Sequence, residues 1–335
     1  MNYLKHYLTR SLEFCLLLGF VSITQFTHSQ QLELTKYTKD TLINSISQKI
    51  GDNYVFQDKA KVMQTELLRA AQAGTFDTIQ NPQIFATSVQ SFLRKFCDND
   101  KHLRLMYFPA SDDKVESDNQ KSLIPLEREF EKRKKINFGI PEIKMLPGNI
   151  GYLKISKLTS PKLMGPVISA SSEFLKHVDA LVLDLRPRGG GSSYTMELLL
   201  SYFLPEATHI FTWDFRDPGA LEQSWTLPYV DGKRFLDIPI TVLTSKETFS
   251  GSEAVAYALK HHKRATIIGE TTAGGAHTYK EFSLSKEYLF LVPYGRMVST
   301  QTNANWEAVG VVPDIEISAD GALERALMEL SEKLK

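Results

Sequence analysis

The chain has 335 residues, a 42% hydrophobic and 10% aromatic content, and a formal net charge of zero. This length exceeds what one compact core usually needs, so we expect a large domain with a smaller companion. The composition argues against wholesale disorder, and the absence of a basic excess gives no indication of a nucleic-acid partner.

Residues 1–29 have the layout of a secretory signal peptide. Lys5 and Arg10 precede an apolar stretch over 12–23, and polar residues follow. The apolar stretch is shorter than the about 20 residues that a spanning helix needs. A buried N-terminal helix is the alternative interpretation. We expect cleavage within 27–31, export to the periplasm or the exterior, and no stable membrane span after the signal is removed.

Cysteine usage is sparse. Cys15 would leave with the signal peptide, which leaves Cys97 alone and excludes an internal disulfide in the mature chain. A lone cysteine after an apolar helix is more often buried packing than a nucleophile. We therefore do not expect Cys97 to be catalytic, although His102 follows it closely.

Residues 30–108 are expected to form a small helical domain. Helices are predicted over 34–50 and 57–73, each ending at a glycine, and a third helix begins at Asn81-Pro82. Apolar residues of the third helix recur at the spacing of one helical face. A mere packing appendage is the alternative to a functional domain.

Residues 109–147 are charged and low in aromatic residues, which favours a linking loop followed by an exposed helix. The basic run KRKK lies beside EREFE, so a solvated helical face explains it without nucleic-acid contact.

From residue 148 to 335 the pattern changes to alternating strands and helices. Alternation of this kind predicts βαβ units with right-handed crossovers and a largely buried parallel sheet. The expected strands are 150–158, 180–186, 209–215, 239–245, 265–270, 280–284 and 288–292, and the expected helices are 162–176, 194–203, the one opening at Ser250, and an amphipathic helix in 321–335.

The sequence VLTSKETFSGSEAVAYALKHH places Ser250 at a helix start just after a strand. Reacting groups in open α/β sheets collect at the carboxyl ends of strands, and the free N–H groups of a helix start can bind an oxyanion. Gly251 would let a substrate approach the backbone closely. Ser250-x-x-Glu253 also fits a capping box, so Ser250 can be a helix cap instead of a nucleophile. Ser252 is a second candidate hydroxyl.

Three consecutive glycines, Gly189, Gly190 and Gly191, follow the buried strand ALVLDLR. Such a loop exposes backbone N–H groups to an anion. It lacks the Gly-Lys-Ser/Thr of a phosphate loop and the spacing of a dinucleotide fingerprint. A tight turn is the alternative, but an oxyanion loop would supply what a serine nucleophile needs.

The motifs DLRPRGGG, VLTSKETFSGSEAVAYALKHHKRATIIGETTAGGA and NWEAVGVVPDI resemble the core of the carboxyl-terminal processing (tail-specific) serine peptidases, over residues 148–335. Within that family the tricorn and interphotoreceptor retinoid-binding protein-like branch is the nearer one. The resemblance implies an α/β fold with a crotonase-like βαβ spiral core beside the small N-terminal helical domain. It also implies that Ser250 is the nucleophile.

The family resemblance also implies which residue acts as the general base. Many processing peptidases use a lysine after the next strand, and Gly275 occupies that position here, so a Ser–Lys mechanism is excluded. The tricorn-like branch uses histidine. His102, in the Asp-x-His element of CDNDKHLRLMY, is therefore expected as the base, and Glu307 of NWEAVGVVPD as its orienting carboxylate.

Other roles for these residues are weaker. His102 can be a partly exposed histidine at a domain junction and Glu307 a surface carboxylate, while His277, near the glycine pair, is the one rival base worth testing. Asp98, Asp100 and His102 lack a second cluster that would complete a metal site, so no metal and no cofactor are expected.

The sequence thus predicts an exported serine peptidase with a peptide or protein substrate. The stretch 109–147 is too short for the peptide-binding module that many processing peptidases insert there. The alternative function is a non-catalytic binder of small hydrophobic ligands or peptides on the same scaffold. Aromatic residues between two core strands could line an apolar cleft, although ordinary packing explains them as well: Trp213, Phe215, Trp225 and Tyr229.

Overall fold

A computed structural model describes residues 34–109, 126–217 and 219–335. The predicted signal peptide lies outside these residues, as does most of the predicted linking loop. None of the described helices is long and apolar enough to cross a membrane.

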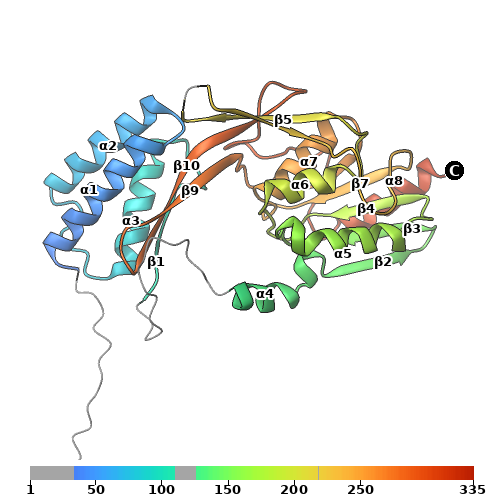
Figure 1. Cartoon of the computed structure of the whole chain (residues 1–335), viewed down its shortest axis with the longest axis horizontal. Coiled ribbons are helices and arrows are strands. Elements are labelled where there is room, and N and C mark those ends of the chain that lie inside the picture. The colour runs from blue at the N-terminus through green and yellow to red at the C-terminus, as the bar shows by residue number, and fades with distance from the viewer. Residues whose placement is uncertain (1–33, 110–125, 218) are drawn as a thin grey trace, which may run out of the picture.

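Three helices form one end of the molecule (Figure 1). These are α1 (Lys36–Asn53), α2 (Gln57–Gln72) and α3 (Pro82–Arg94), and their bounds agree with the sequence prediction within a few residues. The start of α3 has the predicted chemistry, because Asn81 Oδ1 accepts a hydrogen bond from Ile84 N at 3.0 Å. The N-terminal helical part of the fold prediction is confirmed.

A mixed six-stranded sheet forms the other end, in the order β11-β8-β7-β4-β3-β2. All neighbouring strands are parallel except β2, which pairs antiparallel with β3. Strand β2 falls in the stretch that we expected to be a linker. The strands are β2 (Glu142–Leu146), β3 (Ile150–Lys154), β4 (Ala180–Asp184), β7 (Ile240–Thr244), β8 (Thr266–Gly269) and β11 (Ile315–Glu316).

Helices cover both faces of this sheet, as its continuous apolar strands require. Residues on one face, such as Leu181, pack with α5, α6 and α7, whereas Val182 on the other face packs with α8. The helices are α5 (Pro161–Phe174), α6 (Ser193–Leu200), α7 (Gly251–His261) and α8 (Ala322–Lys333). The predicted α/β alternation is confirmed.

A second, antiparallel sheet joins the two ends, in the order β1-β10-β5-β6, with β9 also paired to β10. Strand β6 was not expected. The strands are β1 (Arg104–Tyr107), β5 (His209–Phe215), β6 (Leu221–Trp225), β9 (His277–Ser283) and β10 (Tyr288–Ser299). The helix α4 (Leu126–Lys134) and a short 3-10 turn (Asn137–Gly139) precede β2.

Strand β10 belongs to both hydrophobic cores. Its first half pairs with β1 and β9 and contributes Phe290 to the cluster under the helices, while its second half pairs with β5 and contributes Met297 to the large core. The division of the chain into separate domains stays a prediction. The shared strand means that the helical layer and the core are joined by hydrophobic packing.

This shared strand predicts a single unfolding transition. Phe290→Ala should lower the free energy of unfolding by about 3–5 kcal/mol, because Phe290 is fully buried between the helices and the sheet. Far-UV circular dichroism reports on the whole chain and tryptophan fluorescence on the core, and the two thermal curves should stay superimposed. Met328→Ala, at an exposed site of α8, is the control and should change stability by less than about 0.5 kcal/mol. Loss of helical signal before the fluorescence change would contradict the coupling.

Candidate active site

Ser250 lies between the end of β7 and the first turn of α7. Its backbone is left-handed, with φ 54° and ψ −123°, which is uncommon for a residue with a side chain. The expected capping box with Glu253 is present, and Ser250 N donates to Glu253 Oε2 at 2.7 Å. The Ser250 hydroxyl is nevertheless available to a second partner, because it also lies 3.1 Å from His102 Nε2.

Glu253 does more than cap the helix. Its buried carboxylate also accepts hydrogen bonds from Thr272 Oγ1 at 2.5 Å, Gly274 N at 2.6 Å and Gly275 N at 2.9 Å. Burial raises the pKa of Glu253, and the hydrogen bonds oppose this effect. Glu253 therefore connects the loop after β8 to the backbone of Ser250. The sequence marked this residue only as a cap.

The His102 side chain is held between two aromatic rings. Phe249 stacks on it with ring centroids 4.7 Å apart and Tyr279 with centroids 5.8 Å apart. Burial lowers the pKa of His102 to about 4, so the ring is neutral near pH 7 and can accept a proton. Within the described residues, His102 Nδ1 has no hydrogen-bond partner.

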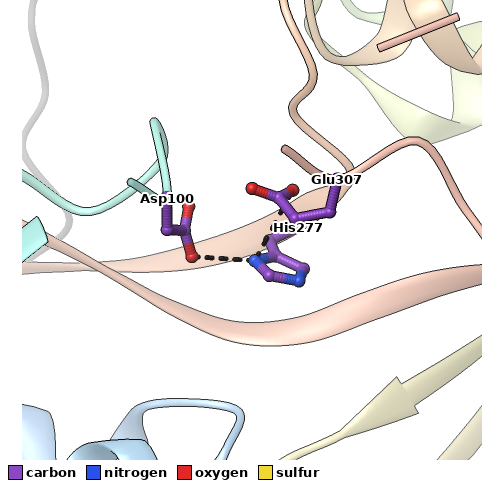
Figure 2. Close-up of side chains that lie close together, drawn as sticks. All are labelled: Asp100, His277 and Glu307. Atoms are coloured by element: carbon purple, nitrogen blue, oxygen red, sulfur yellow. Dashed lines mark hydrogen bonds and ion pairs between the residues drawn. The ribbon is translucent and has the colours of Figure 1, made fainter. Parts of the chain in front are cut away.

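Asp100 fixes the backbone next to His102. Its Oδ1 accepts a hydrogen bond from His102 N at 2.9 Å. Its Oδ2 accepts from His277 Nδ1 at 2.8 Å, as Figure 2 shows, and from Tyr54 Oη at 3.2 Å. Tyr54 follows α1, so the helical layer contacts the candidate site directly. No motif in the sequence indicates that Tyr54 belongs to the site.

Glu307, the expected orienting carboxylate of His102, contacts other groups instead. Its Oε2 accepts a hydrogen bond from Ala276 N at 2.5 Å and is 3.6 Å from His277 Nδ1 (Figure 2). Among the described residues no hydrogen bond joins Glu307 to His102, and Glu307 Oε1 has no partner. Burial raises the pKa of Glu307 to about 7, and the neighbouring Asp100 charge adds to this effect while His277 opposes it.

The glycine loop, Gly189–Gly191, packs against the start of α7. A Cβ at Gly190 would lie 3.0 Å from Ser250 Cβ, and one at Gly191 would overlap Leu158 O, so this part of the loop accepts only glycine without rearrangement. Gly189 faces Ser252, whose hydroxyl is buried and lacks a described partner. The loop and Ser250 are therefore adjacent, as an oxyanion loop requires.

A cavity of about 320 Å³ lies beside Ser250. Ser250, Gly251 and Gly191 are among the residues that line it. Of the aromatic residues that we expected in a cleft, only Trp213 lines this cavity, and Trp225 and Tyr229 are exposed elsewhere. Its other lining residues are Ser192, Ser193, Tyr194, Met196, His277, Thr278, Tyr279 and Met297.

Two other possible sites of chemistry are the Cys97 thiol and a group of potential metal ligands. Burial raises the pKa of the Cys97 thiol to about 12, which disfavours the reactive thiolate. Asp100, His277 and Glu307 offer ligand atoms within 4.8 Å of one another, a group that could hold a metal ion. Asp100 Oδ2 accepts a hydrogen bond from His277 Nδ1, and Glu307 Oε2 accepts one from Ala276 N, so these residues form a hydrogen-bonded cluster.

Curated proteins are similar to this chain over about half of its length. Carboxyl-terminal-processing peptidase 2, chloroplastic, of Arabidopsis thaliana is 31% identical over 179 residues, which cover 50% of this chain and 33% of that protein. The chain thus spans about a third of the length of such curated relatives.

Solved structures share the fold over a longer range. A lipoprotein from Streptococcus agalactiae superposes with a TM-score of 0.58 and 18% identity, over 88% of this chain and 96% of that one. The tricorn protease gives a TM-score of 0.57 and 14% identity, over 89% of this chain and 37% of that one. These likenesses confirm the fold, and the branch within the family stays a prediction. Residues 149–317, half of the chain, match the family described as Peptidase family S41, and the chain belongs to that family.

Proposed function

We propose that this protein is a serine peptidase in which Ser250 is the nucleophile and His102 the general base. The observation that carries the proposal is the 3.1 Å distance between His102 Nε2 and Ser250 Oγ, in a chain of peptidase family S41. A base within hydrogen-bonding reach is what a serine hydroxyl needs, because the hydroxyl alone is a weak nucleophile.

The proposed reaction proceeds through an acyl-enzyme. Ser250 Oγ attacks the carbonyl carbon of the scissile peptide bond while its proton passes to His102 Nε2. The tetrahedral intermediate then collapses as His102 returns that proton to the leaving amine. A water molecule then attacks the acyl carbonyl carbon while His102 Nε2 takes its proton. The ester bond breaks as His102 returns that proton to Ser250 Oγ, and the second product leaves.

Backbone N–H groups of Gly191 and Gly251 are the proposed donors to the oxyanion. Both residues line the cavity with Ser250, and Gly251 N lies at the start of α7, where the helix dipole favours negative charge. Gly190 supports this role by its close approach to Ser250, and Gly189 by its packing on Ser252.

The position of Gly275 supports histidine over lysine as the base. A Cβ at this position would lie 2.8 Å from His102 Cε1 and would overlap the Phe249 ring. A lysine here would therefore occupy the space of the His102 side chain. Glycine at position 275 leaves free the space that the His102 imidazole fills.

The proposed substrate is a peptide or protein chain. Met196, Trp213 and Met297 give the cavity beside Ser250 an apolar wall, which suits an uncharged side chain next to the scissile bond.

Glu307 is proposed as the carboxylate that stabilises positive charge around the base. It would act from its position next to His277, and Asp100 lies between them and His102.

The first test uses covalent labelling of the nucleophile. Ser250→Ala should abolish labelling by a serine-directed aryl phosphonate, and His102→Ala should slow peptide hydrolysis on the order of 10⁶-fold. Ser252→Ala is the matched control and should label normally, because its hydroxyl is buried without a described partner. Labelling that survives in Ser250→Ala would place the nucleophile elsewhere. Saturable binding of a lipid without hydrolysis of any peptide or ester would favour the alternative binding function.

The second test concerns the space for the base. Gly275→Ala should displace His102 or Phe249 and lower the labelling rate about 10²-fold, because a 1 Å misplacement can cost that much. Gly165→Ala is the control, since a Cβ there meets only Leu198 Cδ2 at 3.5 Å, an ordinary contact. Wild-type labelling of Gly275→Ala, measured by intact mass spectrometry, would reject the tight fit around His102.

We also propose export of the protein, on the basis of the signal-peptide layout in residues 1–29. Expression in a Gram-negative host should yield periplasmic protein whose N-terminal residue lies between 27 and 31. Edman sequencing or mass spectrometry of the N-terminal peptide measures this. Cytoplasmic protein with an intact residue 5–23 segment would contradict the proposal.

A further inference from the structure

Asp100, His277 and Glu307 form a largely buried cluster of ionisable groups (Figure 2), and Asp100 connects it to the backbone of His102. Asp100 is 1% exposed and His277 4% exposed. Burying charged groups costs several kcal/mol per ion unless they are paired, and apolar residues of similar volume often serve stability equally well. The mechanism proposed above uses none of the His277 atoms, so the cluster calls for an explanation beyond stability.

Asp100 is the connection between this cluster and the base. One carboxylate oxygen accepts from His102 N and the other accepts from His277 Nδ1. A carboxylate is planar and rigid, so holding one oxygen on His277 fixes the direction in which the other faces His102. Residue 102 is thereby held where its ring meets Ser250.

The ring of His277 is itself held on several sides. Its Nδ1 is 2.8 Å from Asp100 Oδ2 and 3.6 Å from Glu307 Oε2, and Phe56 contacts the ring edge-on with centroids 5.8 Å apart. Phe56 and Tyr54 both come from the segment after α1. The helical layer, strand β9 and the loop around Glu307 therefore converge on one imidazole.

We propose that His277 is a positioning residue for the catalytic base: by donating from Nδ1 to Asp100, it holds the Asp100 carboxylate against the His102 backbone and keeps His102 Nε2 on Ser250 Oγ. This inference rests on the proposed serine peptidase function. It also assigns the N-terminal helices a part in catalysis, since Tyr54 and Phe56 hold the same pair of residues from the other side.

The charges around His277 favour its protonated form. Burial opposes the charge, but the hydrogen bond and charge of Asp100, together with Glu307, outweigh burial and raise the pKa of His277. Arg296 acts in the opposite direction, although it is paired with Asp214. Tyr54, the remaining ionisable group that contacts this cluster, is neutral, because burial and the Asp100 charge raise its pKa.

These directions set the sign of the pH dependence. The imidazolium donates a stronger hydrogen bond to Asp100 than neutral histidine does. Positioning of His102 is therefore strongest below the raised pKa of His277 and weakens as the pH rises through it. His102 itself must be neutral to accept a proton, so activity also falls as the pH drops through about 4. Wild-type activity should have both limbs.

Two substitutions at residue 277 separate positioning from packing. His277→Leu keeps the volume but removes the donor, and it should slow phosphonate labelling of Ser250 about 10²-fold. His277→Asn places an amide N–H close to the position of Nδ1, so it should recover most of that loss. His177→Leu, at an exposed site, is the matched control and should label like the wild type.

The pH profile of activity distinguishes positioning by His277 from a purely structural role, because a structural role would not change the shape of the profile. Asparagine does not titrate, so His277→Asn should lose the alkaline limb and keep the acid limb of His102. Should His277→Leu not fold, as judged by circular dichroism, this profile decides alone. The inference is overturned by a fast His277→Leu, by an equally slow His277→Asn, or by an alkaline limb that persists in His277→Asn. A wild-type protein that never labels overturns the serine peptidase proposal itself, and this inference with it.

Discussion

The arrangement around Ser250 depends on the buried carboxylate of Glu253. Four donors converge on it: the amides of Ser250, Gly274 and Gly275, and the Thr272 hydroxyl. Without these partners a carboxylate at this depth would carry a large desolvation cost. With them it fixes the left-handed backbone of Ser250 and the loop that carries Gly275 in one step. Because Gly275 lies against the His102 ring, the carboxylate also sets the space in which the base lies.

A second constraint brings the proposed base and the proposed nucleophile together although they are 148 positions apart in the chain. His102 follows the third helix, whereas Ser250 follows a strand of the parallel sheet, and strand β10 connects these two regions by pairing with both β1 and β5. Phe290 packs under the helices and Met297 in the large core. The helical layer is therefore more than an appendage. Its packing determines where residues 100–102 lie relative to α7.

Sequence reasoning could predict the features that depend on neighbours in the chain. The α/β alternation, the first three helices and the cap at Asn81 all follow from local periodicity and turn chemistry, and the structure contains them. The positions of Ser250 and the glycine loop followed from the family motifs, which the match to peptidase family S41 supports. Strand β6 was missed because LEQSW is polar and mostly exposed, so it carries no apolar alternation.

The features that sequence reasoning could not predict depend on contacts between distant residues. Asp100 and His277 are 177 positions apart, and nothing local to either residue indicates the bond between them. The sequence also left open whether the aromatic residues between two core strands line a cleft. Trp213 faces the cavity, but Trp225 stacks on His209 at the sheet edge, because β6 is an outer strand. Residue type alone does not distinguish an edge strand from a cleft.

Some buried polar atoms of this site have hydrogen-bond partners among the described residues, and others do not. Glu253 and Asp100, which hold backbone in place, have their hydrogen bonds filled. Among the described residues, the buried His102 Nδ1 and Glu307 Oε1 have no partner. A buried acceptor or donor that is left without any partner costs about 1–3 kcal/mol.

Such a cost is retained where the atoms serve a state other than the resting one. When His102 takes the proton of Ser250, its Nδ1–H becomes a donor on a cation, and nearby carboxylates then gain an electrostatic role that they lack while the ring is neutral. Burial lowers the pKa of His102, and the Asp100 charge opposes this effect. In the proposed mechanism the Asp100 charge would therefore offset part of the burial cost at the stage when His102 carries the proton.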